Sequence, residues 1–339
     1  MSAEPAAVPL ETAAPARGAA GLPDPRWRAG ELVFWALPVL AYFLFPGYLV
    51  LGSQVFITAL LALSLDLILG YAGIVSLGHA AFFGIGAYTA GLLARHGWGE
   101  PLSGLAAGGA LAALAGFLVS FLVVRGEDLA RLMVTLGIGQ LVYEAANKAA
   151  GITGGVDGLG DMAVGSLLGR FPFDLEGRTA WIYSLTVLFA CFALARRVVS
   201  SPFGLSLRAI RECGKRMPAL GAPVRQRLVA VFTLSAGLAG IAGALLAQTT
   251  QFVGLEVLGF TRSAELLIIL VLGGTGRLYG GLVGAPIFML AQNFLSRINP
   301  TYWQFWLGLL LVAAVLFARG GLLGGADRVR SFLERRAER

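Results

Sequence analysis

The chain has 339 residues, of which 57% are hydrophobic and only 13% are charged, and its mean hydropathy is +0.77. Soluble domains carry roughly 25% charged residues, so this composition argues against a soluble enzyme and against a disordered chain. The net charge of +7 raises nucleic-acid binding as an alternative, which the positions of the basic residues test. Glycine is abundant, with 47 residues, as expected where membrane helices pack closely. The two cysteines give no basis for a disulfide framework or a zinc site.

Apolar runs predict an all-α, polytopic membrane protein with about ten transmembrane helices, because a bilayer core needs roughly 20 apolar residues per helix. The runs cover residues 32–51, 54–70, 78–94, 103–124, 132–150, 180–198, 228–250, 264–282, 284–298 and 304–320. Three of them, at 54–70, 78–94 and 284–298, are short and interrupted by glycine. Broken or re-entrant helices are the alternative at these three places.

Most basic residues fall on one side of the predicted membrane. With the N-terminus inside, 20 of the 26 Lys and Arg residues lie in inside segments. This bias predicts cytoplasmic N- and C-termini and argues against nucleic acid as a partner. The predicted organisation is a cytoplasmic tail at 1–30, a transmembrane domain at 31–320 and a cytoplasmic tail at 321–339. Within the transmembrane domain, residues 151–178 form an extracytoplasmic loop and residues 199–227 a cytoplasmic loop.

The cytoplasmic loop contains a short basic segment with helical character. Ser201 and Pro202 predict a helix start, because a hydroxyl cap followed by proline suits the first turn. Arginines separate the apolar residues that follow, and Gly221 is placed to end the helix. Two interpretations stay open from these residues alone: a contact for a soluble partner, or a helix lying on the anionic inner leaflet.

The same loop resembles the cytoplasmic loop of permease subunits in branched-chain amino acid (Liv-type) ABC importers. The shared pattern, S-P-x-G-x-x-x-x-A-I-R-[ED] followed by A-L-G, is supplied by Ser201, Pro202, Gly204, Ala209, Ile210, Arg211, Glu212, Ala219, Leu220 and Gly221. The resemblance implies that this loop carries the coupling helix that binds the ATPase subunit. The coupling residues it implies are Arg208, Ala209, Ile210, Arg211, Glu212, Leu220 and Gly221. Pro218 departs from the pattern and leaves the register of the helix open.

Three further blocks are similar to the same family: residues 64–94, Tyr143 with residues 153–159, and residues 263–286. The resemblance therefore runs from about residue 50 to 320. It implies a transport subunit of an ATP-driven importer in the cytoplasmic (inner) membrane of a bacterium. The implied partners are ABC ATPase subunits, a second permease subunit in a hetero- or homodimer, an extracytoplasmic substrate-binding protein and the lipid bilayer. The implied substrate is a branched-chain amino acid, with urea or a short amide as the alternative within the same family.

A glycine pattern occurs twice. Residues 69–78 and 272–281 both read L-G-x-x-G-x-x-x-x-G, 203 residues apart, which indicates either an internal repeat or glycine bias. Glycines at such places suit broken helix ends and close backbone approach near a transport pathway. Together with polar residues in or beside the predicted spans, they give the predicted pathway residues: Asp66, Gly73, Ser76, Gly78, His79, Glu144, Glu265, Gly273 and Gly276.

Each charged or polar pathway candidate also has a structural interpretation. Asp66, Glu144 and Glu265 could line the pathway, or each could cap or pair with a neighbour at the membrane interface. Ser263 offers an N-terminal helix cap beside Glu265. His79 could titrate near neutral pH or make a structural hydrogen bond. In the family that this chain resembles, that position tends to be His or Gln, which favours the hydrogen bond.

The sequence contains no phosphate-binding G-x-x-x-x-G-K-[ST] loop, no H-E-x-x-H, no Cys/His cluster and no G-x-S-x-G turn. We therefore expect no catalytic residue, no metal and no cofactor, and ATP hydrolysis must come from separate subunits. An ion-coupled secondary transporter is the alternative from another class, with Asp66 as its one well-placed acid. An intramembrane enzyme is disfavoured, because His79 and His96 are the only histidines.

Overall fold

The computed structural model describes residues 29–298 except Leu168 and Leu175, together with scattered positions between 300 and 324. The predicted tail at 1–30 lies outside this part of the chain apart from its last two residues. The apolar run at 304–320 and the tail at 321–339 are described only at isolated positions. Two isolated β-bridges, Leu159 with Val253 and Leu167 with Phe171, are the only β-structure among the described residues.

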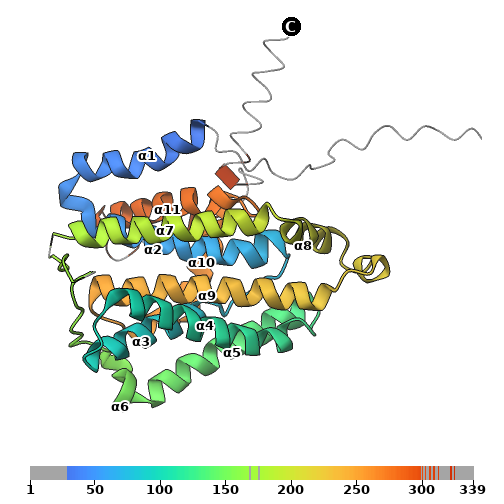
Figure 1. Ribbon diagram of the computed structural model, residues 1–339, viewed down its shortest axis with the longest axis horizontal. Helices are drawn as coiled ribbons and strands as arrows, with labels where there is room; N and C mark the ends of the chain where they lie inside the picture. The colour runs from blue at the N-terminus through green and yellow to red at the C-terminus, as the bar shows by residue number, and fades with distance from the viewer. Residues whose placement is uncertain are drawn as a thin grey trace, which may run out of the picture.

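The described residues form α-helices that run side by side as a bundle (Figure 1). Their bounds are α1 (Ala29–Leu44), α2 (Leu49–Asp66), α3 (His79–Arg95), α4 (Pro101–Val123), α5 (Asp128–Lys148), α6 (Ala150–Thr153), α7 (Arg178–Val199), α8 (Pro202–Cys213), α9 (Val224–Thr250), α10 (Phe260–Gly273) and α11 (Leu278–Ile298). The short helices α8 and α6 lie at opposite ends of the bundle, which we call the α8 end and the α6 end (Figure 1).

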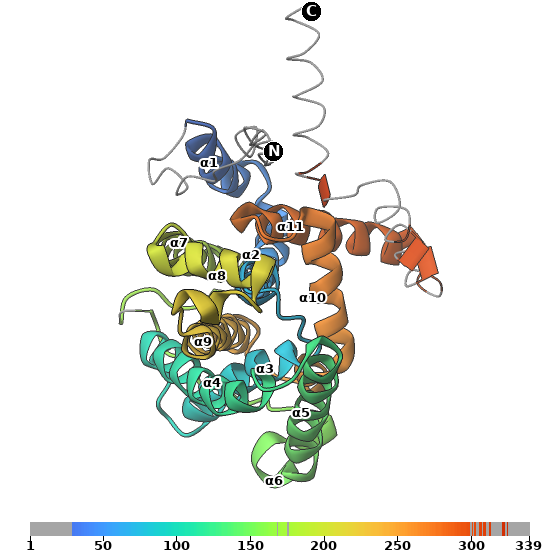
Figure 2. The same cartoon turned by 90° about the vertical axis from the view of Figure 1, so that its right-hand side faces the viewer.

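Helix α2 lies at the centre of the bundle, between α7, α9, α10 and α11 (Figure 2). Every residue of α2 from Phe56 to Asp66 is buried, because this helix is apolar on all sides. Small residues let the neighbouring helices approach closely. A Cβ atom added to Gly86 of α3 would collide with the backbone of Gly240 in α9, and one added to Gly240 would collide with the Gly108 carbonyl of α4.

Five segments are long and apolar enough to cross a membrane, and a shorter apolar helix covers Gly30–Leu44. The five are Pro46–Tyr71, Pro101–Val123, Arg178–Val199, Val224–Thr250 and Leu278–Ile298. All-helical structure with several such segments is consistent with a polytopic membrane protein. Ten spans and cytoplasmic termini stay predictions.

The structure corrects the predicted limits of the first two runs. The run at 32–51 is interrupted, because α1 ends at Leu44 and a 3-10 turn, Pro46–Tyr48, precedes α2. Pro46 lacks the N–H that a continuing helix requires. The run at 54–70 is part of a longer segment, since α2 continues into a π-helical turn, Leu67–Tyr71, without a break.

The last two described runs also differ from the prediction. The run at 264–282 crosses a turn, because α10 ends at Gly273 and α11 begins at Leu278. Gly274 and Gly276 have φ values of +115° and +76° there, which side chains with a Cβ rarely adopt. The run at 284–298 lies entirely inside α11, which is one helix of 21 residues containing Pro286.

Candidate functional site

Helix α8 is a short helix that packs against one end of the bundle, the α8 end. As predicted, it begins at Pro202, although the Ser201 hydroxyl donates a hydrogen bond to the Val198 carbonyl (2.6 Å) and does not cap the helix. Its buried face carries Leu207 and Ile210. The helix ends at Cys213, whose side chain is exposed, whereas the second cysteine, Cys191, is buried in α7.

Gly221 does not end α8, which corrects the expected length of this helix. After Cys213 the chain forms a separate 3-10 turn, Met217–Leu220, with Pro218 in its first turn, where a missing N–H costs little. Gly221, with a φ of +77°, ends that turn. The departure from the family pattern at Pro218 therefore falls outside the helix.

The residues predicted for ATPase coupling divide between two surfaces. Arg208 and Arg211 reach toward the bundle: the Arg208 guanidinium lies 5.1 Å from the centroid of the Tyr71 ring, and Arg211 donates a hydrogen bond to the Gly70 carbonyl. Ile210 is buried and Ala209 is half-buried. Glu212, Leu220 and Gly221 are exposed, and so is part of Arg211, so a partner can contact these four residues.

The two glycine patterns meet beside Arg211. The Asp66 carboxylate Oδ1 accepts a hydrogen bond from the Gly276 N–H (2.7 Å), and a Cβ atom at Gly70 would collide with both of these groups. A Cβ at Gly73 would lie 3.0 Å from Arg211 Cγ, and one at Gly276 would lie 2.9 Å from Arg211 Nη1. We call these five residues the glycine junction.

Backbone geometry relates the two copies of the pattern. Gly73 and Gly276 hold the same position in the two copies, and their φ values are +74° and +76°. Several glycines outside the pattern, among them Gly154 (+79°) and Gly177 (+78°), have the same φ, so an internal repeat and glycine bias both stay open. Gly273, the first glycine of the second copy, packs against α11, because a Cβ there would collide with the Gly280 carbonyl.

His79 makes a buried hydrogen bond at the start of α3. Its Nε2 lies 2.8 Å from the Ser64 hydroxyl, which in turn donates to the Leu61 carbonyl (2.6 Å). A hydroxyl has one proton, so this arrangement assigns the donor role in the first bond to Nε2 of His79. Its Nδ1 is buried without a hydrogen-bond partner. The contact is the one expected of a structural histidine.

Other side chains pack the same region and correct the predicted role of Ser263. The Ser263 hydroxyl accepts a hydrogen bond from the Ala80 N–H (3.0 Å), and α10 begins earlier, at Phe260, so Ser263 does not cap α10 beside Glu265. Gly78 packs directly against the Thr135 carbonyl of α5. Ser76 is buried, and its hydroxyl has no partner.

The remaining predicted acids, Glu144 and Glu265, lie neither in the glycine junction nor beside His79. Glu144 is exposed on α5, where the Gln140 side chain lies 3.3 Å away. Glu265 forms an ion pair with Arg262 (3.1 Å) near the start of α10. Sequence reasoning missed Arg262, although its spacing of three residues from Glu265 on a helix was a usable signal. In the described part of the chain, no three His, Cys, Asp or Glu side chains are grouped as metal ligands.

Comparison with known proteins decides the family. The model of the family described as "branched-chain amino acid transport system / permease component" matches residues 48–315. The chain belongs to this permease family. The family membership predicted from the sequence is therefore confirmed, and the permease is a multi-pass membrane subunit of the ABC transporter type.

Relatives of this permease carry similar names. It is 31% identical over 326 residues to the high-affinity branched-chain amino acid transport system permease protein LivM of Escherichia coli K12, covering 86% of this chain and 75% of LivM. It is also 31% identical over 224 residues to the L-arabinose ABC transporter permease protein AraH of Azospirillum brasilense, covering 62% of each chain. No solved structure matches this permease.

Proposed function

We propose that this permease imports branched-chain amino acids as the membrane subunit of an ATP-driven importer in the bacterial cytoplasmic membrane. Its likeness to LivM over most of both chains supports this substrate class. In the proposed topology about ten helices cross the bilayer, both termini and the α8 end face the cytoplasm, and the α6 end faces outward. The bias of basic residues supports this orientation.

The observation that carries the coupling part of the proposal is the hydrogen bond from Arg211 to the Gly70 carbonyl. ATPase subunits bind the exposed residues beyond this bond, among them Glu212 and Leu220. A displacement of α8 then reaches the glycine junction through Arg211, where the ends of α2 and α10 meet. Nucleotide binding favours one arrangement of these helix ends and hydrolysis restores the other, which gives alternating access.

A second permease subunit and an extracytoplasmic binding protein complete the proposed importer. Helix α5 exposes large apolar side chains that either lipid or a second subunit can cover: Leu129, Met133, Leu136 and Leu141. The second subunit pairs with this permease to enclose the pathway. The binding protein delivers substrate at the α6 end.

Reconstitution tests the proposal. The permease is purified with candidate ATPase and permease subunits and placed in proteoliposomes with the binding protein and radiolabelled leucine, urea or L-arabinose. We expect ATP-dependent uptake of leucine. Uptake of urea alone would identify the alternative substrate class, and uptake of any solute by the permease without ATPase subunits would identify a secondary transporter.

A further inference from the structure

A cavity of about 620 Å³ opens at the α6 end, between α2, α10, α11 and the segment that joins α9 to α10. This volume lies within the roughly 300–1,000 Å³ of small-molecule sites. Its lining includes Ile57, Thr58, Val257, Arg262, Glu265 and Gln292. The cavity is separate from the glycine junction, which lies at the other end of α2.

The cavity holds one ion pair in its wall. Arg262 Nη1 lies 3.1 Å from Glu265 Oε2, and the two side chains are 28% and 21% exposed. Partly exposed pairs of this kind are weak, because water screens both charges. A ligand with both a carboxylate and an ammonium group can therefore displace this pair, because its carboxylate can pair with Arg262 and its ammonium group with Glu265.

A buried polar atom and an apolar wall complete the cavity. Thr58 is 2% exposed and its hydroxyl has no hydrogen-bond partner, yet the residue lines the cavity. Such groups are nearly always satisfied in proteins, so an unpaired hydroxyl at a cavity wall indicates a ligand or water. Ile57 and Val257 are buried beside it and offer an apolar surface.

We propose that this cavity receives a zwitterionic α-amino acid with an apolar side chain, before it enters the transport pathway. The substrate carboxylate pairs with Arg262, its ammonium group pairs with Glu265, and its side chain lies against Ile57 and Val257. Charge-assisted hydrogen bonds favour a zwitterion over neutral urea or a short amide. This inference rests on the proposed function and names the residues that select the substrate.

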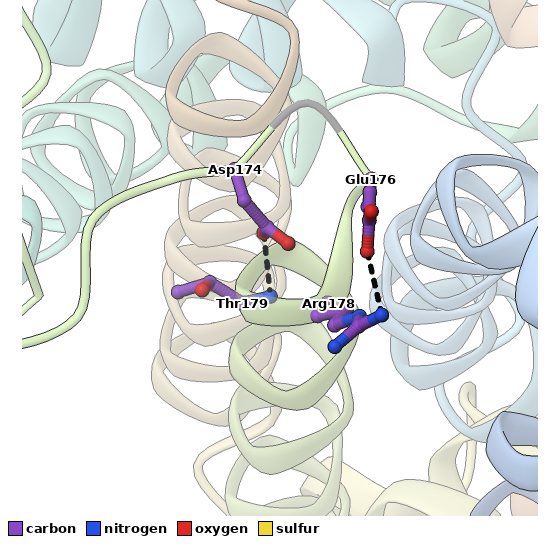
Figure 3. A network of polar contacts seen from close by, with 4 residues as sticks. All are labelled: Asp174, Glu176, Arg178 and Thr179. Carbon is purple, nitrogen blue, oxygen red and sulfur yellow. Dashed lines mark hydrogen bonds and ion pairs between the residues drawn. The ribbon is translucent and has the colours of Figure 1, made fainter.

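A second ion pair provides a matched control. Arg178 Nη2 lies 2.7 Å from Glu176 at the start of α7, and Asp174 accepts a hydrogen bond from the Thr179 N–H (3.1 Å; Figure 3). The Arg178 and Glu176 side chains are 61% and 66% exposed, and neither lines the cavity. Arg178→Gln therefore removes an ion pair without altering the cavity.

Thiol protection tests binding directly. In the full importer without binding protein, Cys213→Ser removes the exposed native thiol and Gln292→Cys places a reporter in the cavity wall. We expect saturating leucine to slow labelling of this cysteine by a methanethiosulfonate reagent about tenfold, whereas urea leaves the rate unchanged. Arg262→Gln and Glu265→Gln should each remove the protection, and Arg178→Gln should keep it. Equal labelling with and without leucine would overturn the proposal.

Transport by the same variants separates this inference from the proposed function. We expect Arg262→Gln and Glu265→Gln to reduce ATP-driven leucine uptake about tenfold, the order of effect of losing a charge-assisted hydrogen bond, while co-purification with the ATPase subunits checks that each variant assembles. If wild-type importer takes up leucine and both variants match it, only the cavity assignment is wrong. If wild-type importer takes up no leucine, the proposed function is wrong.

Discussion

Asp66 and Gly276 are 210 positions apart in the chain, yet the Asp66 carboxylate accepts a 2.7 Å hydrogen bond from the Gly276 N–H. The bond joins the end of α2 to the turn that follows α10. Arg211 of α8 contacts the same place through the Gly70 carbonyl. A single small region therefore connects the helix proposed to bind the ATPase with two helices of the bundle.

Removing the acceptor at Asp66 should loosen this connection. We expect Asp66→Ala to lower the free energy of unfolding by about 1–3 kcal/mol, because the Gly276 N–H loses its partner. Asp66→Asn keeps an oxygen at the same place and should cost less. Thermal unfolding of the purified permease in detergent measures both. If Asn is as damaging as Ala, the charge of Asp66 matters more than its hydrogen bond.

Gly276 should be less tolerant of substitution than a glycine of similar backbone conformation elsewhere. Alanine at a positive φ costs about 1–2 kcal/mol, and Gly276 (+76°) and Gly97 (+86°) share that cost. Only at Gly276 does the added Cβ also crowd Arg211 and the Gly70 carbonyl, since nothing lies within 4 Å of it at Gly97. We expect Gly276→Ala to abolish coupled transport and Gly97→Ala to preserve it. Equal uptake by the two variants would contradict the role of the junction.

Substitutions on the two surfaces near α8 should produce different defects. Arg211→Gln removes the hydrogen bond to Gly70, so we expect the assembled importer to hydrolyse ATP while leucine uptake falls about tenfold. Leu220→Asp changes a side chain that is 79% exposed, so the permease should stay folded and fail to co-purify with the ATPase subunits. Val156→Asp is the matched control, because Val156 is 84% exposed and follows α6 directly. Normal co-purification of Leu220→Asp would place the ATPase contact elsewhere.

His79→Gln should preserve stability better than His79→Ala. The Gln amide can donate to the Ser64 hydroxyl as Nε2 does in the structure. Alanine leaves a cavity and removes the donor at a site that is 1% exposed, at an expected cost of about 2–4 kcal/mol. Detergent unfolding curves and leucine uptake measure the difference. Loss of transport by a stable Gln variant would show that the imidazole itself is required.

The sequence predicts the family, the all-helical class and the start of α8 at Pro202, because motifs, apolar runs and proline positions are local properties. It does not predict which arginines of α8 turn toward the bundle. The sequence around Arg208 and Arg211 does not indicate whether these side chains contact Tyr71 and Gly70 or face solvent. Tertiary relationships decide this.

Helix limits show the same difference between local and distant information. Ser263 is a reasonable cap by residue type, but α10 begins at Phe260 and the Ser263 hydroxyl binds the backbone of Ala80, 183 positions away. The sequence identified only one member of the ion pair in the cavity. Glu265 was a predicted pathway residue because of its charge, whereas Arg262 was not. Spacing identifies such pairs only when both members are considered together.

The distribution of the two cysteines makes the native permease convenient to label. Cys213, exposed at the last residue of α8, is available to a maleimide fluorophore, whereas Cys191 is buried. A dye attached there stands beside the surface proposed to meet the ATPase. Changes in its emission during nucleotide turnover would follow the engagement of the two proteins in real time, without any engineered substitution.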